Sequence, residues 1–282
     1  MVDKNKIYII SPSDLSYICY HCAYLKNNYG LFNSSISAGI TSTLDGIEKN
    51  YFLGSCKKIS QELPEGQVID PYNQVFFSKV LTDNEGRKFR IKGKCDAIIK
   101  FVDGKSGIID FKTSKFKKDE SKKTDAFKPE DLKKKVDEYN PQLHCYSLLY
   151  SNLETDREFL KTTSRAKKED SIIKSIDDRL DKIKNVSIDE ARFLGIVFIY
   201  PEDVLEGNKL GVYFSYKYEP LKVDMKNFMN LITKYLGILD QNDPPPIPEE
   251  CGSGKGMKKC LSHSFFYDVK KLKDLEKNKI KL

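Results

Sequence analysis

The chain has 282 residues, 39% of them hydrophobic and 32% charged, and its formal net charge of +7 is compatible with a polyanionic partner. No apolar run approaches the roughly 18 residues of a membrane-spanning helix, and the first residues lack the apolar stretch of a secretory signal. We therefore expect a cytoplasmic protein with no membrane partner, whose seven cysteines are reduced thiols or metal ligands.

Near the N-terminus, a helix is predicted to begin with Ser11 as N-cap and Pro12 as the first helical residue. This helix would carry Cys19 and Cys22 in the sequence Cys-Tyr-His-Cys. The two-residue spacing lets both sulfurs reach one metal ion. Buried structural thiols account for the same pattern equally well.

A second helix is predicted over residues 35–53, where one face carries the apolar side chains Ile40, Leu44, Ile47 and Tyr51. Asp45 and Glu48 are one turn apart and share another face of this helix. Acidic residues at this spacing are ordinarily exposed to solvent.

The stretch Gly93–Ser114 predicts a β-hairpin with charges at one end, because two apolar runs flank an Asp-Gly turn. Residues two apart on a strand point to the same side, so Asp110 and Lys112 would lie together, next to Asp96 if the strands pair. The isoleucines before Asp110 indicate a mostly buried strand, where an unpaired carboxylate is costly. We interpret the cluster as a divalent-cation site; a charged hairpin edge in solvent is the alternative.

After a lysine-rich segment at 115–135, Asn140 and Pro141 predict the N-cap and first residue of another helix. Gln142 and Tyr146 are four residues apart and share a face of it. Tyr146 also belongs to an apolar stripe, so a plain core position is the alternative.

The next elements are expected at 155–190 (a polar helical insertion), 195–200 and 210–218 (strands) and 223–239 (an amphipathic helix). Pro201 is expected to close the first of these strands. The chain then reaches a proline-rich segment at 244–248, Cys251 and Cys260, and a basic tail at 269–282.

Taken in order, these elements resemble the PD-(D/E)xK nuclease superfamily, specifically RecB-type nuclease domains and the CRISPR-associated RecB-like exonucleases. Gly93-Lys94-Cys95-Asp96 resembles the first acidic motif, and Asp110-Phe111-Lys112-Thr113-Ser114 resembles the acid-x-Lys motif. Gln142 to Tyr146 resembles the Gln-x-x-x-Tyr motif of this branch. The resemblance covers roughly residues 11–261, without the polar insertion and the terminal tail.

The resemblance implies an α/β fold, a restriction-endonuclease-like core with a central mixed sheet flanked by helices. We expect a single nuclease-like domain over 1–282, composed of a core at 35–150 and 193–240, the helical insertion, the basic tail and a cysteine-linked subregion that joins 11–26 to 244–263.

The implied activity is metal-dependent hydrolysis of phosphodiester bonds in DNA, on single strands or ends. Asp96 and Asp110 would bind Mg²⁺ or Mn²⁺, with the backbone carbonyl of Phe111 as a further ligand. Lys112 would orient the attacking water or offset charge on the phosphate. Gln142 and Tyr146 would position DNA or the metal-site side chains.

Two features depart from the family pattern. Many members place a histidine metal ligand on the early helix, which here has none, so Asp45 is our first candidate replacement and Glu48 the second. Iron–sulfur members hold a 4Fe–4S cluster with one cysteine before the core and three after it. The partition here is two and two, namely Cys19, Cys22, Cys251 and Cys260, a set that suits a cluster or, alternatively, Zn²⁺, with His263 as a further possible ligand.

The alternative function is a catalytically inactive nucleic-acid-binding or scaffold subunit on the same fold. The chain has no Gly-x-x-x-x-Gly-Lys-Ser/Thr motif for ATP, so any unwinding needs a helicase or other protein partner. The pathway stays open among DNA repair, CRISPR adaptation and mobile elements.

Overall fold

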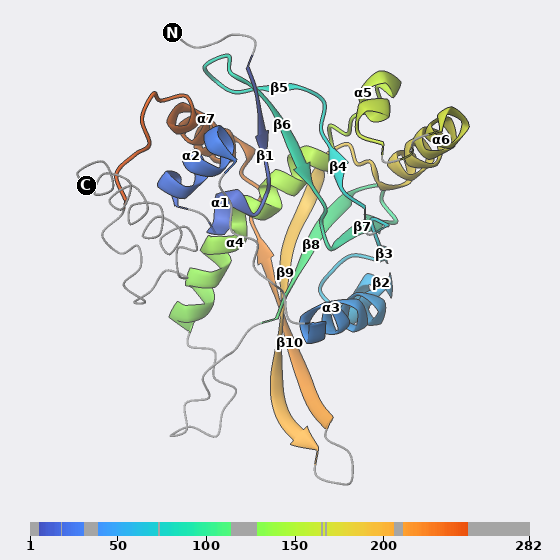
Figure 1. Cartoon of the computed structure of the whole chain (residues 1–282). Coiled ribbons are helices and arrows are strands. Elements are labelled where there is room, and N and C mark those ends of the chain that lie inside the picture. The colour runs from blue at the N-terminus through green and yellow to red at the C-terminus, as the bar shows by residue number, and fades with distance from the viewer. Residues whose placement is uncertain are drawn as a thin grey trace, which may run out of the picture.

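The structure is a computed structural model that describes residues 6–17, 19–30, 39–72, 74–113, 129–164, 166, 168–205 and 211–247. These residues form a mixed α/β fold in which a curled six-stranded mixed sheet is flanked by helices (Figure 1). The expected fold class is confirmed at this level. No helix in the described part of the chain is long and apolar enough to cross a membrane.

The helices are α1 (Asp14–Tyr17), α2 (Tyr20–Tyr29), α3 (Gly39–Phe52), α4 (Pro129–Tyr150), α5 (Arg157–Thr162), α6 (Glu169–Val186) and α7 (Met225–Leu239), with a short 3-10 turn η1 (Cys56–Lys58). The strands are β1 (Ile7–Ile10), β2 (Gly54–Ser55), β3 (Gly66–Ile69), β4 (Phe76–Phe77), β5 (Leu81–Thr82), β6 (Lys88–Gly93), β7 (Ala97–Phe101), β8 (Ser106–Thr113), β9 (Ala191–Leu205) and β10 (Gly211–Leu221).

The central sheet has the order β10-β9-β8-β7-β3-β2, in which β8 and β9 are parallel and all other neighbours antiparallel. A parallel pair needs a long crossover connection, and here the connection includes α4, α5 and α6. A smaller sheet is built on β6, which pairs with β1, β4 and β5.

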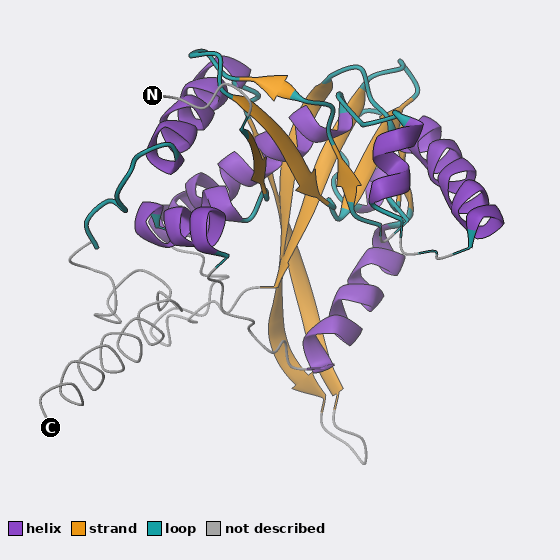
Figure 2. Cartoon of the chain, turned by 45° about the horizontal axis from the view of Figure 1, so that its top comes forward, coloured by secondary structure: helices purple, strands orange, loops and turns teal. Residues whose placement is uncertain are grey.

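Strand alternation divides the core between the two faces of the central sheet. Ile108 on β8 belongs to the cluster that contains α4, α7 and the smaller sheet. Ile109 and Phe111 on the same strand belong to a second cluster with Phe52 of α3. The β9–β10 hairpin projects from the sheet with α3 beside it (Figures 1 and 2). Near the end of β8, even-numbered residues therefore point to the face of Ile108, and odd-numbered residues point to the face of Ile109 and Phe111.

Two predicted helix boundaries are wrong. The helix α4 runs without a break through Asn140 and Pro141, which were expected to begin a new helix. Pro141 costs one backbone hydrogen bond, but Leu143 and Leu149 beyond it are fully buried, and this packing keeps the helix continuous. At the N-terminus, the single helix expected from Pro12 onward is two helices, and Cys19 is the N-cap residue of the second.

Two other expectations also fail. The face of α3 that was predicted to be buried is partly exposed to solvent. Ile47 and Tyr51 are 60% and 58% exposed, whereas Glu48 is buried. Strand β9 continues past Pro201 to Leu205. The pairing of β9 with β10 is irregular at that point, and such an irregularity tolerates a residue with no N–H to donate.

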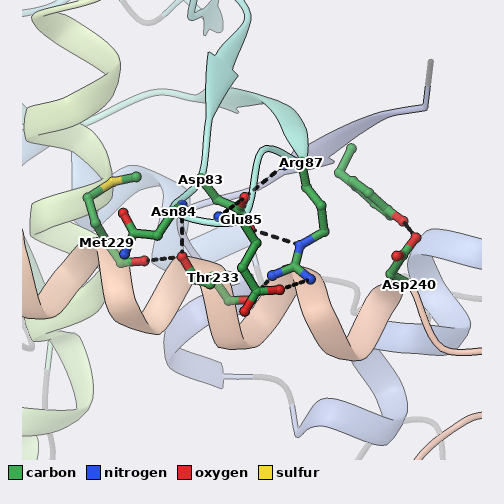
Figure 3. A network of polar contacts seen from close by, with 8 residues as sticks. Asp83, Asn84, Glu85, Arg87, Met229, Thr233 and Asp240 are labelled. Atoms are coloured by element: carbon green, nitrogen blue, oxygen red, sulfur yellow. Dashed lines mark hydrogen bonds and ion pairs between the residues drawn. The ribbon is translucent and has the colours of Figure 1, made fainter. Parts of the chain in front are cut away.

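A network of polar contacts around the buried Asp83–Arg87 pair fastens the smaller sheet to α7 (Figure 3). Arg87 donates from Nε to Asp83 (2.8 Å) and from Nη2 to the carbonyl of Thr233 (2.7 Å), and Nη1 pairs with Glu85 at 2.8 Å. The backbone N–H of Asn84 donates to Thr233 Oγ1 at 3.2 Å. The side chain of Asp83 is fully buried, so Arg87 is the group that compensates its charge.

Replacing Arg87 should strongly destabilise the fold. In Arg87→Ala the buried carboxylate of Asp83 loses its cation, and removing one partner of a buried pair costs about 3–5 kcal/mol. Urea unfolding followed by circular dichroism measures the change. The control is Arg192→Ala, because Arg192 and Glu190 are 3.9 Å apart and both largely exposed; its free energy of unfolding should change by less than about 0.5 kcal/mol. Equal losses in the two variants would contradict the assignment.

Candidate active site at the end of the β7–β8 hairpin

The predicted hairpin is confirmed, and its register brings the two acidic motifs together. Strands β7 and β8 pair antiparallel with Ala97 opposite Ile109, so Asp96 comes next to Asp110. Gly104 in the connecting turn has φ of 82°, a left-handed conformation that glycine adopts without strain. The Asp-Gly signal in the sequence therefore identified both the turn and the pairing.

Asp110 is the most buried charged group of the site, with 1% of its surface exposed. Its Oδ2 forms an ion pair with Nζ of Lys112, which lies two residues along the same face of β8. The Lys112 ammonium also lies 4.9 Å from the centre of the Tyr139 ring on α4. This cation therefore has a carboxylate and an aromatic face as neighbours.

Asp96 is held from two sides. Its Oδ2 accepts a hydrogen bond from the backbone N–H of Phe111 at 3.0 Å, and its Oδ1 lies 3.0 Å from Nζ of Lys49. The same Lys49 amine pairs with Asp45 at 2.9 Å. The backbone N–H of Phe111, the expected carbonyl ligand, thus links the acid-x-Lys motif to Asp96, and Lys49 connects Asp96 to α3.

Burial sets the protonation of this cluster. It raises the pKa of Asp110 to about 7, because the Lys112 ammonium offsets only part of the desolvation and the Asp96 carboxylate opposes ionisation. For Lys112, burial favours the neutral amine, but the carboxylates of Asp110 and Asp96 outweigh it and the pKa is raised. At pH 7 the Asp110 carboxyl is therefore about half protonated, and an added cation would displace that proton.

Gln142 and Tyr146 face the site from α4. Both are buried, and Gln142 Nε2 donates to the Tyr146 hydroxyl at 3.2 Å. The Gln142 Oε1 atom is buried with no hydrogen-bond partner among the described residues. A buried acceptor of this kind is costly unless a further donor or cation reaches it.

The glycine of the first acidic motif lets α4 approach. A Cβ atom at Gly93 would lie 2.8 Å from the Pro12 ring and 3.3 Å from the Tyr146 ring. A larger residue would collide with the Pro12 ring and crowd the Tyr146 ring. Close packing thus explains the glycine at this position.

The two candidates for a third acidic ligand differ in their surroundings. The Asp45 side chain is 50% exposed and paired with Lys49. Glu48 is buried, and its Oε1 accepts from the Thr113 hydroxyl at 3.2 Å. Burial raises the pKa of Glu48, and the Asp45 and Asp96 carboxylates add to this effect. The structure thus places Glu48, the second choice from the sequence, against β8.

In the described ranges, no three or more His, Cys, Asp or Glu side chains are grouped so that they could hold a metal ion. Strand alternation keeps the acidic side chains apart. Asp110 faces α4, whereas Glu48 reaches β8 from the α3 face. Asp96 and Asp110 are a pair of oxygen donors that suits Mg²⁺ or Mn²⁺, ions that need only one or two carboxylates beside water and phosphate.

Sequence reasoning missed Lys49. It is the second lysine of the site, since it pairs with both Asp45 and Asp96, and these carboxylates raise its pKa against the opposite effect of burial. The only available signal was its place one turn after Asp45 on a helix that already carried Glu48.

The cysteine pair lies apart from this site, on α2. The sulfurs of Cys19 and Cys22 are 3.3 Å apart. Two other residues of α2 contact the segment after α7. Nδ1 of His21 lies 2.6 Å from the carbonyl of Pro245, and the Tyr24 hydroxyl donates to the carbonyl of Asn242 at 2.8 Å. Helix α2 therefore contacts the segment that leads to the second pair. Cys251, Cys260, His263 and the tail 269–282 lie outside the described residues.

The raised pKa of Asp110 predicts a pH-dependent stability. A carboxyl whose folded pKa lies above its unfolded value of about 3.8 destabilises the folded state progressively as pH rises from about 4 to about 7. In EDTA, the Tm of Asp110→Asn should therefore rise relative to wild type by a few degrees between pH 5 and pH 8.

The control for this experiment is Asp103→Asn. Asp103 lies in the exposed turn, where hydrogen bonds from Lys105 lower its pKa, so its contribution is constant above pH 5. Differential scanning fluorimetry across the pH range measures both differences. Parallel curves for wild type and Asp110→Asn would contradict the buried, protonated carboxyl.

Comparison with known proteins assigns no family to this chain. No family model matches it, and no curated protein matches it. Among solved structures, the chain is similar to one titled "Crystal structure of SSO0001", with 16% sequence identity, a TM-score of 0.37, and coverage of 84% of this chain and 78% of that one. At this TM-score the similarity carries no weight for fold or function, so the functional argument depends on the site itself.

Proposed function

We propose that this protein is a metal-dependent DNA nuclease with a PD-(D/E)xK-type core, acting on single strands or ends. The observation that supports it most is the buried Asp110 carboxyl, which lies beside Asp96 and shares a strand face with Lys112. A structural ion pair would need one acid and one base. Two adjacent acids are costly unless positive charge reaches both. Lys112 and Lys49 supply part of that charge, and a bound metal ion, which phosphodiester hydrolysis requires, would supply more.

In this proposal each residue of the site has a separate role. Asp96 and Asp110 would hold Mg²⁺ or Mn²⁺, which when bound supplies polarisation of the phosphate and a lowered pKa of the attacking water. Lys112 remains charged beside Asp110 and offsets negative charge at the phosphate. The buried amide oxygen of Gln142 and the Tyr146 hydroxyl orient groups that enter from the α4 side.

One observation favours the alternative of a non-catalytic nucleic-acid-binding subunit. Lys49 and Lys112 already neutralise the carboxylates, as expected for a site that needs no metal. The cleavage experiment decides between the two.

The cysteines complete the proposal. Cys19 and Cys22 are close enough to ligate one centre, and α2 contacts the segment six residues before Cys251. We propose that these two, with Cys251 and Cys260, hold a 4Fe–4S cluster or Zn²⁺. Iron, sulfide and zinc analysis of anaerobically purified protein distinguishes these options, and the same protein is then used for cleavage.

Cleavage should require the metal and the three charged residues. End-labelled single- and double-stranded DNA should be cut by wild type with Mg²⁺ or Mn²⁺ and not with EDTA. Asp110→Ala removes a cation ligand and should abolish cutting. Lys112→Ala should also abolish cutting while the affinity for DNA stays within a few-fold, because the lysine acts on the reacting phosphate.

Surface variants provide the matched controls for this assay. Lys184→Ala removes an exposed lysine of α6 that pairs only with an exposed aspartate, and should cut like wild type. A metal-loaded protein that binds DNA without cutting it would establish the non-catalytic alternative. A fully active Lys112→Ala variant would remove Lys112 from the mechanism.

A direct comparison identifies the third acid. Because Glu48 is buried against Thr113 whereas Asp45 is half exposed, Glu48→Gln should lower kcat/KM with Mg²⁺ by about 10- to 100-fold. Asp45→Asn should lower it only a few-fold. Both substitutions preserve shape, so equal Tm values check the fold. The reverse order of the two losses would restore Asp45 as the ligand.

A further inference from the structure

A row of aromatic side chains covers the α3 face of the central sheet beside the candidate active site. Tyr51 on α3 is 58% exposed, and Phe214 and Tyr216 on β10 are each 40% exposed. Phe214 and Tyr216 are two residues apart on one strand and so point to the same face. We call these three exposed rings the aromatic platform.

Buried rings hold the platform in place. Phe52 stacks on Phe111 with ring centres 5.1 Å apart and planes at 15°, and its ring meets Tyr216 edge-on at 5.0 Å. Tyr51 lies 6.5 Å from Tyr216, whose hydroxyl donates to the carbonyl of Lys58 at 2.7 Å. Tyr51 and Tyr216 are therefore preorganised and lose little conformational freedom when a ligand covers them.

The strand register connects the platform to the candidate catalytic strand. Thr113 on β8 is opposite Ile199 on β9, and Ile199 is opposite Tyr216 on β10. Two strand spacings separate Thr113 from Tyr216, which is about 10 Å. Thr113 directly follows Lys112 and holds Glu48 on the α3 face, whereas Asp110 and Lys112 point to the α4 face. A strand on the platform would therefore reach the carboxylates by passing over the end of β8.

The charge around the platform favours a polyanion with flat rings. The Lys58 ammonium lies 5.9 Å from the centre of the Tyr51 ring, and Lys57 is its neighbour in η1. Burial and, to a smaller extent, the Glu62 carboxylate raise the pKa of Tyr218, which lies two residues beyond Tyr216 on β10, to about 12. Exposed aromatic faces next to lysines are the features by which proteins bind single-stranded nucleic acid.

We propose that the aromatic platform stacks the bases of a single DNA strand whose phosphodiester bond lies at Asp96 and Asp110. This inference rests on the proposed nuclease function and specifies its substrate as single-stranded. Every base presents a flat face, so the platform binds without sequence preference. In a duplex the bases are already stacked on each other, so the platform discriminates against intact double strands.

The test measures binding separately from cleavage. In an Asp110→Ala background with EDTA, fluorescence anisotropy gives the Kd for a labelled single strand of about 15 nucleotides and for the matching duplex. Combining Tyr51→Ala with Tyr216→Ala should weaken single-strand binding at least about tenfold and leave duplex binding unchanged. Combining Tyr51→Phe with Tyr216→Phe keeps the rings and should retain the affinity. Tyr29→Ala removes a tyrosine on α2 that is about as exposed as Tyr51 and serves as the control.

A fluorescent reporter tests the same contact without deleting a ring. The chain has no tryptophan, so Tyr216→Trp introduces a single reporter on the platform. Its fluorescence should be quenched when the single strand binds and should change little with the duplex. Tyr29→Trp is the matched reporter away from the platform and should not be quenched.

The outcomes separate the platform from the nuclease proposal. If wild type cuts DNA but the alanine variants bind single strands as tightly as their parent, the platform proposal is wrong and the nuclease proposal stands. If the alanine variants lose single-strand affinity while wild type never cuts, the nuclease proposal fails and the platform stands. An unquenched Tyr216→Trp reporter, or a parent that does not bind single strands, overturns the platform. Loss of a dimer in light scattering with unchanged DNA binding would instead make this surface an interface between copies.

Discussion

The site depends on one electrostatic constraint, which is the burial of the Asp110 carboxyl next to that of Asp96. Two acids this close cannot both ionise cheaply in a desolvated place, so the surroundings must supply positive charge or a proton. The structure supplies Lys112 on the same strand, Lys49 from α3 and the Phe111 amide. Each of these groups is positioned by the need to compensate the pair.

Strand alternation then determines which partners each group can have. Even-numbered positions near the end of β8 face α4, where Gln142 and Tyr146 are buried, and odd-numbered positions face α3. Phe111 and Thr113 lie on the α3 face, one in the buried aromatic packing and the other bonded to Glu48. Strand β8 therefore carries Asp110 and Lys112 on the face toward α4. The surface suited to stacking lies on the opposite face, two strands away on β10.

Local signals allowed much of this arrangement to be predicted. The Asp-Gly turn and the two apolar runs gave the hairpin, and the two-residue spacing gave the shared face of Asp110 and Lys112. The failures came from tertiary packing, which outweighs local preference. Packing carried α4 through Pro141, turned Ile47 outward and buried Glu48. Lys49 could not be found from sequence, because its role depends on how α3 docks against the end of the hairpin.

The topology separates the assembly of the site from its energetic cost. The hairpin that joins Asp96 to Asp110 closes a short loop, which is fast and loses little chain entropy. Strand β9, the parallel partner of β8, begins only at Ala191, so its pairing closes a much longer loop. The carboxylates can thus meet while still hydrated, and the free energy of removing water from Asp110 is spent only when the distant strand and α4 close over it. The geometry of the site thus depends on a contact between residues close in sequence. The electrostatic cost of the site depends on contacts between residues far apart in sequence.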